Sequence, residues 1–422
     1  MDRALLKEIV LEQREVIKNK DLGIEREKLD LIEGSIKLPH AIVISGIRRV
    51  GKSTLLAQIM SKFYKYDAYY LNFEDERLMD FKVSDFNTLY EIFVELFGEK
   101  QVFFFDEIQN VKEWEAFVRR MYDRKFKFFI TGSNASLLSK ELGTKLTGRF
   151  VPVELFPFSF REYMRFKKYS LPDKALMLTK ERGKIKRFFN GYLKEGGMPE
   201  YLKYKDLDIL RRIYDDILYR DVVARYRIKE IKNLREMSLY FLSNLSALFS
   251  YNKLKQYLNL GSINTVKSFA EYLQNTYILF VINIFSFSLK QQFIAPKKIY
   301  CVDNALANAI AFKFSENRGK FLENVVFVEL KRRGSEIYYH KTAKGLEVDF
   351  LVKKGRKVEK LIQVTLGMGK TGVKERELNA LLSALEELDV KEGMILTEEE
   401  EKEIKLGGKK ITVKPVYKWL LE

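Results

Sequence analysis

The sequence is poor in the residues that build disulfide bonds and metal clusters. Its 422 residues include one cysteine, Cys301, and two histidines, His40 and His340. A single cysteine excludes an intramolecular disulfide and a cysteine-based zinc cluster, and two histidines leave little for histidine–metal chemistry. A chain with so few thiol groups is typical of proteins in a reducing compartment.

The sequence also has no long apolar run. The longest, residues 277–285, is less than half the length of a membrane span. Residues 1–20 mix acidic, basic and apolar side chains too evenly for a signal peptide. We therefore expect a soluble, cytoplasmic protein that has no membrane partner.

Basic residues, by contrast, are abundant and unevenly placed. The net charge is +17, and residues 161–295 account for +12 of it, with 25 Lys and Arg against 13 Asp and Glu. A basic segment of this kind is expected where a protein meets a polyanion such as DNA. A Lys- and Glu-rich surface that leans basic explains the charge equally well.

The hydrophobic pattern predicts an α/β multidomain protein. Residues 1–34 have the pattern of an amphipathic helix. From residue 40 to residue 160, short and continuously apolar runs alternate with helical patterns, as in a parallel sheet whose strands are buried on both faces. After residue 160 the strand signal fades and helical patterns dominate, and strands and helices mix again from residue 297.

A glycine-rich motif follows the first of these apolar runs. Residues 46–53 fit G-x4-G-K-[ST], with an apolar strand before the motif and a helix after it. In that context backbone N–H groups wrap a phosphate, Lys52 can reach the β- and γ-phosphates, and the Ser53 hydroxyl can bind Mg²⁺. We predict a site for ATP or ADP with Mg²⁺, formed by Gly46, Arg48, Arg49, Val50, Gly51, Lys52, Ser53 and Thr54. Contact with an acidic neighbour, rather than with the nucleotide, is the alternative for Arg48 and Arg49.

Two acidic residues end a second apolar run. Asp106 and Glu107 follow residues 102–105, and ligands of open parallel sheets bind at the carboxyl ends of the strands. We expect Asp106 to hold Mg²⁺ through water, and Glu107 to orient or deprotonate the attacking water. Asp106 alone could instead cap a turn at residues 108–110.

Three further candidate residues lie next to predicted strands. Ser133 and Asn134 follow the run 126–130 and could sense the γ-phosphate or the attacking water, or cap the following helix. Arg149 precedes the next strand and could stabilise the transferring phosphoryl group, often of a neighbouring subunit. An ordinary surface arginine is an equal alternative.

Together these elements resemble an AAA+-type ATPase. Residues 156–163 (FPFSFREY) and 196–201 (GGMPEY) further resemble archaeal P-loop ATPases near the STAND and origin-recognition clades. The resemblance implies a homo-oligomer and assigns roles to the phosphate and Mg²⁺ contacts (Lys52, Ser53), the Walker B pair (Asp106, Glu107), sensor 1 (Ser133 or Asn134), the arginine finger (Arg149) and a helical lid over adenine (Pro199).

The resemblance covers nearly the whole chain and divides it into five segments. They are an N-terminal helical segment (1–34), a parallel-sheet P-loop (AAA+-like) ATPase domain (35–165), a helical lid (166–240), a winged helix (241–295) and an α/β nuclease-like C-terminal domain (296–422).

The expected winged helix contains a helix–turn–helix pattern. Residues 252–258 and 262–274 are predicted helices around Gly261; Ser262 is a suitable N-cap, and Ile263, Val266, Ala270 and Leu273 are spaced to form a buried face. A module that docks protein is the alternative to one that binds DNA. The candidate DNA-binding residues are Lys253, Lys255, Asn264 and Lys267.

The C-terminal segment resembles the PD-(D/E)xK nuclease fold. Glu323 on a predicted helix, and Asp349 and Gln363 on predicted strands, match residues that converge on Mg²⁺ in that fold. Thr365 stands where the pattern expects lysine. We therefore expect a degenerate domain that binds without cleaving, unless Lys344 or Lys370 supplies the missing charge.

The leading hypothesis is a Mg²⁺-dependent ATPase that forms oligomers and acts on, or is switched by, DNA. The first alternative is a STAND-type signalling switch between ADP and ATP, whose C-terminal modules dock protein. The second is an ATP-regulated DNA nuclease.

Overall fold

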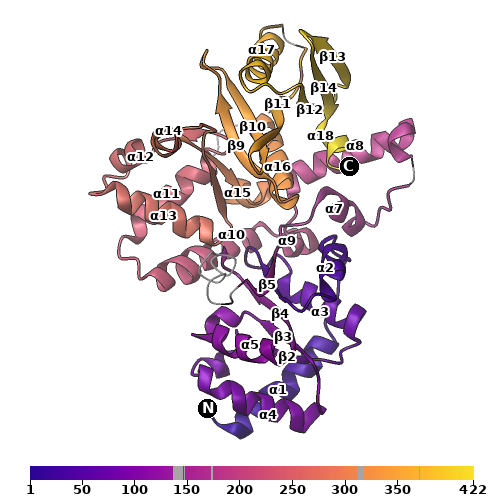
Figure 1. The fold of residues 1–422 in the computed structure, drawn as a ribbon, viewed down its shortest axis with the longest axis vertical. Coiled ribbons are helices and arrows are strands. Elements are labelled where there is room, and N and C mark those ends of the chain that lie inside the picture. Colours follow the sequence, from indigo (N-terminus) through magenta and orange to yellow (C-terminus); the bar gives the residue numbers. More distant parts are fainter. Residues whose placement is uncertain (136–145, 147, 173, 312–317, 370) are drawn as a thin grey trace. The chain divides into compact units, whose positions relative to one another are not determined.

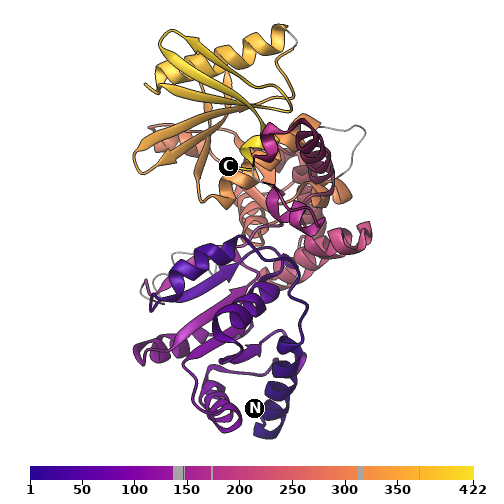
Figure 2. The same ribbon diagram turned by 90° about the vertical axis from the view of Figure 1, so that its right-hand side faces the viewer.

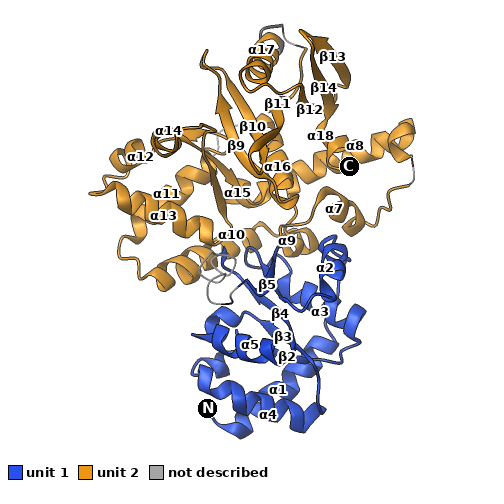
Figure 3. Cartoon of the chain, viewed as in Figure 1, with its two compact units in different colours: residues 1–155 blue, residues 156–422 orange. Residues whose placement is uncertain are grey.

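The chain forms two compact units in a computed structural model. The structure describes residues 1–135, 146, 148–172, 174–311, 318–369 and 371–422. The units are Met1–Leu155 and Phe156–Glu422 (Figure 3). Among these described residues, no helix has both the length and the apolar character that crossing a bilayer requires.

The first unit is built on a parallel sheet. Its five strands have the order β2-β3-β4-β1-β5, and each neighbouring pair is parallel. The parallel α/β domain predicted from the apolar runs is thereby confirmed. The strands are β1 (Ala41–Ser45), β2 (Tyr69–Asn72), β3 (Val102–Asp106), β4 (Lys127–Gly132) and β5 (Phe150–Glu154).

Aromatic side chains fill both faces of this sheet. On one face, Phe103 stacks on Phe128 in a core shared with α1 (Arg3–Lys18), α4 (Phe86–Phe97) and α5 (Trp114–Asp123). On the other face, Tyr64 of α3 (Lys52–Tyr64) lies edge-on to Phe104 and Phe129, with ring centroids 5.6 and 5.5 Å away. Helices therefore cover both faces (Figures 1 and 2), as continuously apolar strands require.

The N-terminal segment belongs to the same unit and is not one helix. Helix α1 ends at Lys18, and α2 (Lys28–Ile36) begins after an irregular stretch. The Asp21 carboxylate accepts a hydrogen bond from the N–H of Gly23, whose φ is +57°, a local turn that a helix cannot contain. The expectation of a single helix over 1–34 was wrong for this reason. The remaining short elements of the unit are η1 (Glu76–Leu78), η2 (Val83–Asp85) and η3 (Ile108–Asn110).

The second unit begins with helices. In chain order they are α7 (Phe160–Phe166), η5 (Ala175–Met177), α8 (Thr179–Glu195), α9 (Pro199–Tyr204), α10 (Leu207–Asp216) and the π-helical η6 (Ile217–Ala224).

A small module of helices around an antiparallel sheet follows. Its sheet has the order β6-β8-β7, and both pairs are antiparallel. The boundary expected at residue 295 assigned β8 to the next segment, whereas the structure pairs β8 with β6 and β7. The elements are α11 (Ile231–Ser243), β6 (Leu248–Phe249), α12 (Tyr251–Tyr257), α13 (Ile263–Asn275), β7 (Leu279–Ile282), α14 (Leu289–Ile294) and β8 (Lys297–Cys301).

The C-terminal part contains a mixed sheet of six strands, with the order β13-β14-β12-β11-β10-β9. Leu351 packs toward α17 (Thr371–Glu387), and its neighbour Phe350 lies near Phe327 of α16 (Arg318–Arg332), so the two helices cover opposite faces (Figure 2). The strands are β9 (Glu336–Lys341), β10 (Glu347–Lys354), β11 (Lys357–Val364), β12 (Glu392–Thr397), β13 (Lys402–Leu406) and β14 (Lys409–Pro415); α15 (Asn304–Ile310) and α18 (Val416–Trp419) complete the unit.

Candidate nucleotide site and carboxylate cluster

The glycine-rich loop connects β1 to α3. A Cβ atom on Gly46 would lie 2.2 Å from the carbonyl oxygen of Leu155, so only glycine fits this close approach. Gly51 has a φ of +98° and is the N-cap residue of α3, a conformation that glycine adopts without strain. The two glycines thus have local structural reasons to be there, and they leave backbone N–H groups at the start of a helix.

Lys52 folds back over the loop and reaches Glu107, the residue that follows β3. Its Nζ donates to the carbonyl oxygens of Gly46, at 3.2 Å, and Ile47, at 3.4 Å. The same atom lies 3.3 Å from a carboxylate oxygen of Glu107, and the lysine side chain is only 4% exposed. The loop and the carboxyl end of β3 are therefore joined through one buried ammonium group.

Asp106 ends β3 in a fully buried position. Its carboxylate accepts hydrogen bonds from the hydroxyls of Thr131 and Ser53. Burial, and then the charge of Glu107, raise the pKa of Asp106, while these hydroxyls and Lys52 oppose the shift. The Ser53 and Asp106 oxygens are thus neighbours, and hard oxygen donors of this kind fit Mg²⁺.

Glu107 begins the turn after β3. It has a φ of +51°, and its N–H donates to Oγ1 of Thr131 at 3.0 Å. Burial opposes ionisation of its carboxyl group, but the charge of Lys52 and a hydrogen bond from Gln109 outweigh burial and lower the pKa of Glu107. Glu107 is therefore a carboxylate at neutral pH.

Ser133 and Asn134 lie just after β4, and both are buried. The side-chain nitrogen of Gln109 is 3.5 Å from the Ser133 hydroxyl and also donates to Glu107. Gln109 thus links the acidic end of β3 to the polar end of β4. This residue was not predicted from the sequence, although it lies two positions after Glu107.

The other predicted residues of the glycine-rich loop have the following positions and contacts. Arg48 pairs with Glu74 at 2.9 Å, Arg49 has a φ of +60°, and Thr54 lies in the first turn of α3. The buried guanidinium of Arg26 donates to the carbonyl oxygen of Val50 at 2.9 Å. No sequence pattern pointed to Arg26, because the apolar spacing predicted a helix there rather than a segment against the loop.

Arg149 lies at the amino ends of the strands, on the opposite side of the sheet from the glycine-rich loop. Its carbonyl oxygen accepts from the N–H of Ala41 at the start of β1, whereas the glycine-rich loop follows the end of β1. The five residues of β1 place its amino end about 13 Å from its carboxyl end, where the loop begins. The Arg149 guanidinium pairs with Asp123 at 2.8 Å and lies over the ring of Tyr122. The structure does not bring Arg149 to the loop of its own chain.

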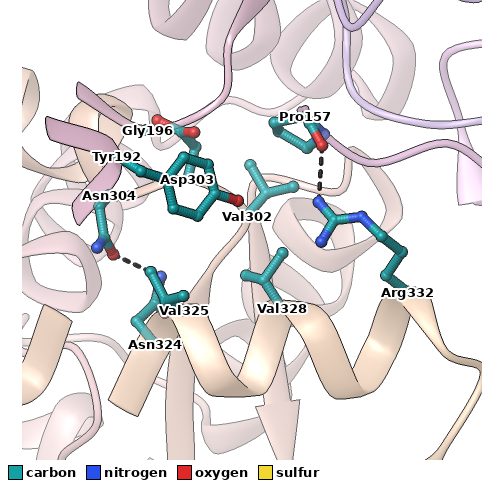
Figure 4. Close-up of a pocket in the computed structure, with 10 residues that line it drawn as sticks. All are labelled: Pro157, Tyr192, Gly196, Val302, Asp303, Asn304, Asn324, Val325, Val328 and Arg332. Carbon is teal, nitrogen blue, oxygen red and sulfur yellow. Dashed lines mark hydrogen bonds between the residues drawn. The ribbon is translucent and has the colours of Figure 1, made fainter. Parts of the chain in front are cut away.

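Pro199 is the first residue of α9 and follows a glycine pair that is tightly enclosed. The N–H of Gly197 donates to Asp303 at 2.6 Å, and a Cβ atom on Gly196 would lie 2.2 Å from the same carboxylate. Figure 4 shows the small pocket beside these residues, where Arg332 donates to the carbonyl of Pro157. These contacts give the glycines a packing role, and the adenine contact of Pro199 stays a prediction.

The candidate DNA-binding residues lie on α12 and α13. Val266, Ala270 and Leu273 are buried as predicted, together with Phe269, while Ile263 is half-exposed. The Ser262 hydroxyl caps α13 by accepting from the N–H of Asn264, as predicted. Lys253, Asn264 and Lys267 are exposed, and Lys255 is half-buried.

Two of the three nuclease-like candidates meet around a lysine that was not predicted from the sequence. The Nζ of Lys298, on β8, lies 2.7 Å from Glu323, 2.9 Å from Glu347 and 2.8 Å from Asp349, and the lysine side chain is 1% exposed. Burial opposes this charge, but Asp349 and Glu323 outweigh burial and raise the pKa of Lys298 well above its ordinary value. We call Lys298, Glu323, Glu347 and Asp349 the carboxylate cluster.

The third candidate, Gln363, has other partners. Its side-chain oxygen accepts from the N–H of Asp349 at 3.2 Å, and its amide donates to Glu377. Thr365 donates to the carbonyl of Gly367 at 3.3 Å, and Lys344 is exposed in the turn between β9 and β10. Lys370 lies outside the described residues. A divalent ion does not fit this arrangement, because an ammonium group already holds the centre between the acids.

Comparison with known proteins identifies the family. A family model described as an AAA domain matches residues 39–164. An uncharacterized protein of Methanocaldococcus jannaschii is 36% identical over 441 aligned positions, which cover 99% of this chain and 96% of that protein. The chain belongs to this AAA-domain P-loop family.

A less similar relative comes from a second organism, and two further family models match the rest of the chain. An uncharacterized protein of Haemophilus influenzae is 29% identical to this AAA-domain protein, over 75% of this chain and 80% of the relative. Two models of domains of unknown function, DUF8612 and DUF4143, match residues 186–317 and 318–419. The solved structure of the Aeropyrum pernix Orc1 protein in complex with DNA aligns with 70% of this chain and 95% of its own, at 12% identity and a TM-score of 0.33, a similarity too weak to carry an argument.

Proposed function

We propose that this AAA-domain protein binds ATP with Mg²⁺ at the glycine-rich loop and hydrolyses it. The observation that carries the proposal is the meeting of Lys52 with Glu107 at 3.3 Å, beside the Ser53–Asp106 pair. A phosphate-binding lysine, a metal-binding hydroxyl and two carboxylates at one sheet edge are the groups that phosphoryl transfer to water requires.

Each group has a distinct part in this proposal. Backbone N–H groups of residues 46–51 and the Lys52 ammonium bind the phosphates, for which Lys52 exchanges its carbonyl partners. Ser53 and Asp106 would hold Mg²⁺, which when bound neutralises charge on the phosphate oxygens. Glu107, which is ionised, accepts a proton from the attacking water. Gln109 and Ser133 hold the Glu107 carboxylate in position.

Arg149 enters the proposal only through a second copy of the chain. Because it lies about 13 Å along the sheet from the loop of its own chain, it can reach a γ-phosphate only in trans. It would first have to leave Asp123, an exposed pairing of low energetic value. The proposal therefore includes a homo-oligomer in which Arg149 faces the nucleotide of a neighbouring chain.

The test is phosphate release from ATP, measured with Mg²⁺ and again after EDTA removes it. We expect turnover with Mg²⁺ and its loss with EDTA, because the Ser53–Asp106 pair alone leaves the phosphate charge unneutralised. Recovery of activity when excess Mg²⁺ returns is the control against denaturation. Turnover that persists in EDTA would contradict the metal's role. Negligible turnover with tightly retained ADP would favour the signalling switch.

A second proposal concerns DNA. The net charge of +12 in residues 161–295 and the exposed Lys253 and Lys267 beside the capped helix α13 support duplex binding by the module of α11 to β8. The helix–strand–helix–helix–strand–helix–strand order around an antiparallel sheet supports its description as a winged helix, in which α14 connects the last two strands.

Salt dependence tests the DNA proposal. Replacing Lys253, Lys255 and Lys267 together by alanine should weaken duplex binding in a gel-shift series. The slope of log K against log salt should become shallower by about 0.9 for each phosphate that the variant no longer neutralises. The matched control removes the same charge elsewhere, at Lys402, Lys405 and Lys410 on β13 and β14. Equal weakening by both triple variants would contradict a contact through α12 and α13.

A further inference from the structure

We infer that Lys298 is a built-in cation that takes the place of a metal ion in the C-terminal domain. Its ammonium group lies within 2.9 Å of an oxygen of each of three acids, Glu323, Glu347 and Asp349. These acids come from α16 and from alternate residues of β10, so a helix and a strand aim carboxylates at one point. Buried carboxylates that converge in this way need a positive charge between them, and here a side chain of the same protein supplies it.

Two of the three acids around Lys298 have further hydrogen-bond partners. One oxygen of Asp349 faces Lys298, and the other accepts from the N–H of Val364 at 2.9 Å. The Glu323 oxygen that faces Lys298 also accepts from the Tyr300 hydroxyl at 2.7 Å. Each of these bonds orients a lone pair toward the ammonium group, and the oxygens are held by neighbouring main chain and hydroxyls rather than by a metal.

Packing keeps Lys298 where it is. The strand that carries it is paired on both sides, by β6 and β7, and all five residues of β8 are buried. The next residue but one, Tyr300, stacks on Phe327 of α16 with ring centroids 4.1 Å apart. These contacts fix the backbone of β8, and the three carboxylates around Nζ hold the ammonium group itself.

Removing the ammonium group should therefore create a divalent cation site. The variant Lys298→Met keeps the length and much of the volume of the side chain and leaves three acids without a cation. We expect it to bind one Mn²⁺ more than the unsubstituted full-length protein, counted in nucleotide-free protein by loss of the free Mn²⁺ electron paramagnetic resonance signal. Mn²⁺ should also raise the melting temperature of this variant more than that of the unsubstituted protein.

Two controls isolate the cluster from the nucleotide site. The double variant Lys298→Met with Asp349→Asn should lose the added Mn²⁺, while keeping any Mn²⁺ bound elsewhere. Lys297→Met removes the neighbouring lysine of β8, whose Nζ donates to the carbonyl of Gln292 outside the cluster, and should add no Mn²⁺. Lys298→Gln, a polar neutral side chain, repeats the test if the methionine variant does not fold.

The unsubstituted protein supplies an independent test. We expect its Mn²⁺ binding to be unchanged by Asp349→Asn alone. A bound Mn²⁺ that disappears on this substitution would overturn the inference, because it would show that metal displaces Lys298. A folded Lys298→Met or Lys298→Gln variant without added Mn²⁺ would overturn it as well.

Discussion

Replacement of Lys52 by alanine is expected to lower ATP turnover by at least about 10²–10³-fold, the range for loss of one preorganised hydrogen-bond donor to a transition state. Lys52 is the buried cation that links the glycine-rich loop to Glu107. Without it, the charge that develops on the γ-phosphate loses its nearest cation, and the ionised Glu107 loses the partner that lowers its pKa. Steady-state phosphate release, with nucleotide binding followed by calorimetry, measures both effects.

A control for this variant lies on the same helix. Lys62 of α3 is exposed and pairs with the exposed Glu25, away from the glycine-rich loop, so Lys62→Ala should leave turnover unchanged. Unfolding of Lys52→Ala, monitored by circular dichroism, separates a folding defect from a chemical one. A folded Lys52→Ala variant that binds and hydrolyses ATP normally would remove the loop from the proposed site.

The variant Glu107→Gln is expected to bind ATP normally and to hydrolyse it about 10²–10⁴-fold more slowly, the usual contribution of a general base. The amide has the shape of the carboxylate but cannot take a proton from water. Since Glu107 has a lowered pKa, the native carboxylate is ready to act as a base at neutral pH. The expected signature is a fall in kcat with little change in ATP affinity.

The matched substitution is Glu113→Gln. Glu113 lies six residues further along, is exposed, and precedes α5, so its loss should not change kcat. Retained turnover in Glu107→Gln would take this residue out of the proposed mechanism. A loss of ATP binding instead of turnover would assign Glu107 to holding Lys52 in place.

The parallel sheet was predictable from sequence because its signal is local. Strands such as residues 102–106 are continuously apolar and end abruptly in acids, a pattern that few other structures produce. Once the strands are parallel, their carboxyl ends lie on one side of the sheet, which predicts that Glu107 and Ser133 share that side. That β3 and β4 are also neighbours is a finding of the structure. The links through Gln109 and Thr131 depend on rotamers, and sequence patterns do not determine these.

The N-terminal segment shows where periodicity fails. The apolar spacing of α1 continues past Lys18, but an aspartate-stabilised turn at Gly23 interrupts the helix. The interruption brings Arg26 to the carbonyl of Val50. The turn at Gly23 therefore determines that Arg26 contacts the glycine-rich loop. Helical periodicity is measured over many residues and does not detect a single turn of this kind.

Lys298 of the carboxylate cluster was not predicted from the sequence for a different reason. Lys298 stands in a short run that otherwise predicts a buried strand, and a buried lysine requires acids nearby. Those acids lie 25 or more residues away in the chain. Their number and identity depend on how β8, α16 and β10 pack, which no local pattern encodes.

The carboxylate cluster joins the two segments of the second unit that separate family models match. The lysine belongs to the segment 186–317, whereas Glu323, Glu347 and Asp349 belong to the segment 318–419. A chain cut between them would leave one fragment with a buried ammonium group and the other with three facing acids, each stripped of its counter-charge. The boundary between the two family models therefore separates a buried lysine from its three carboxylates, and we expect the two segments to fold together.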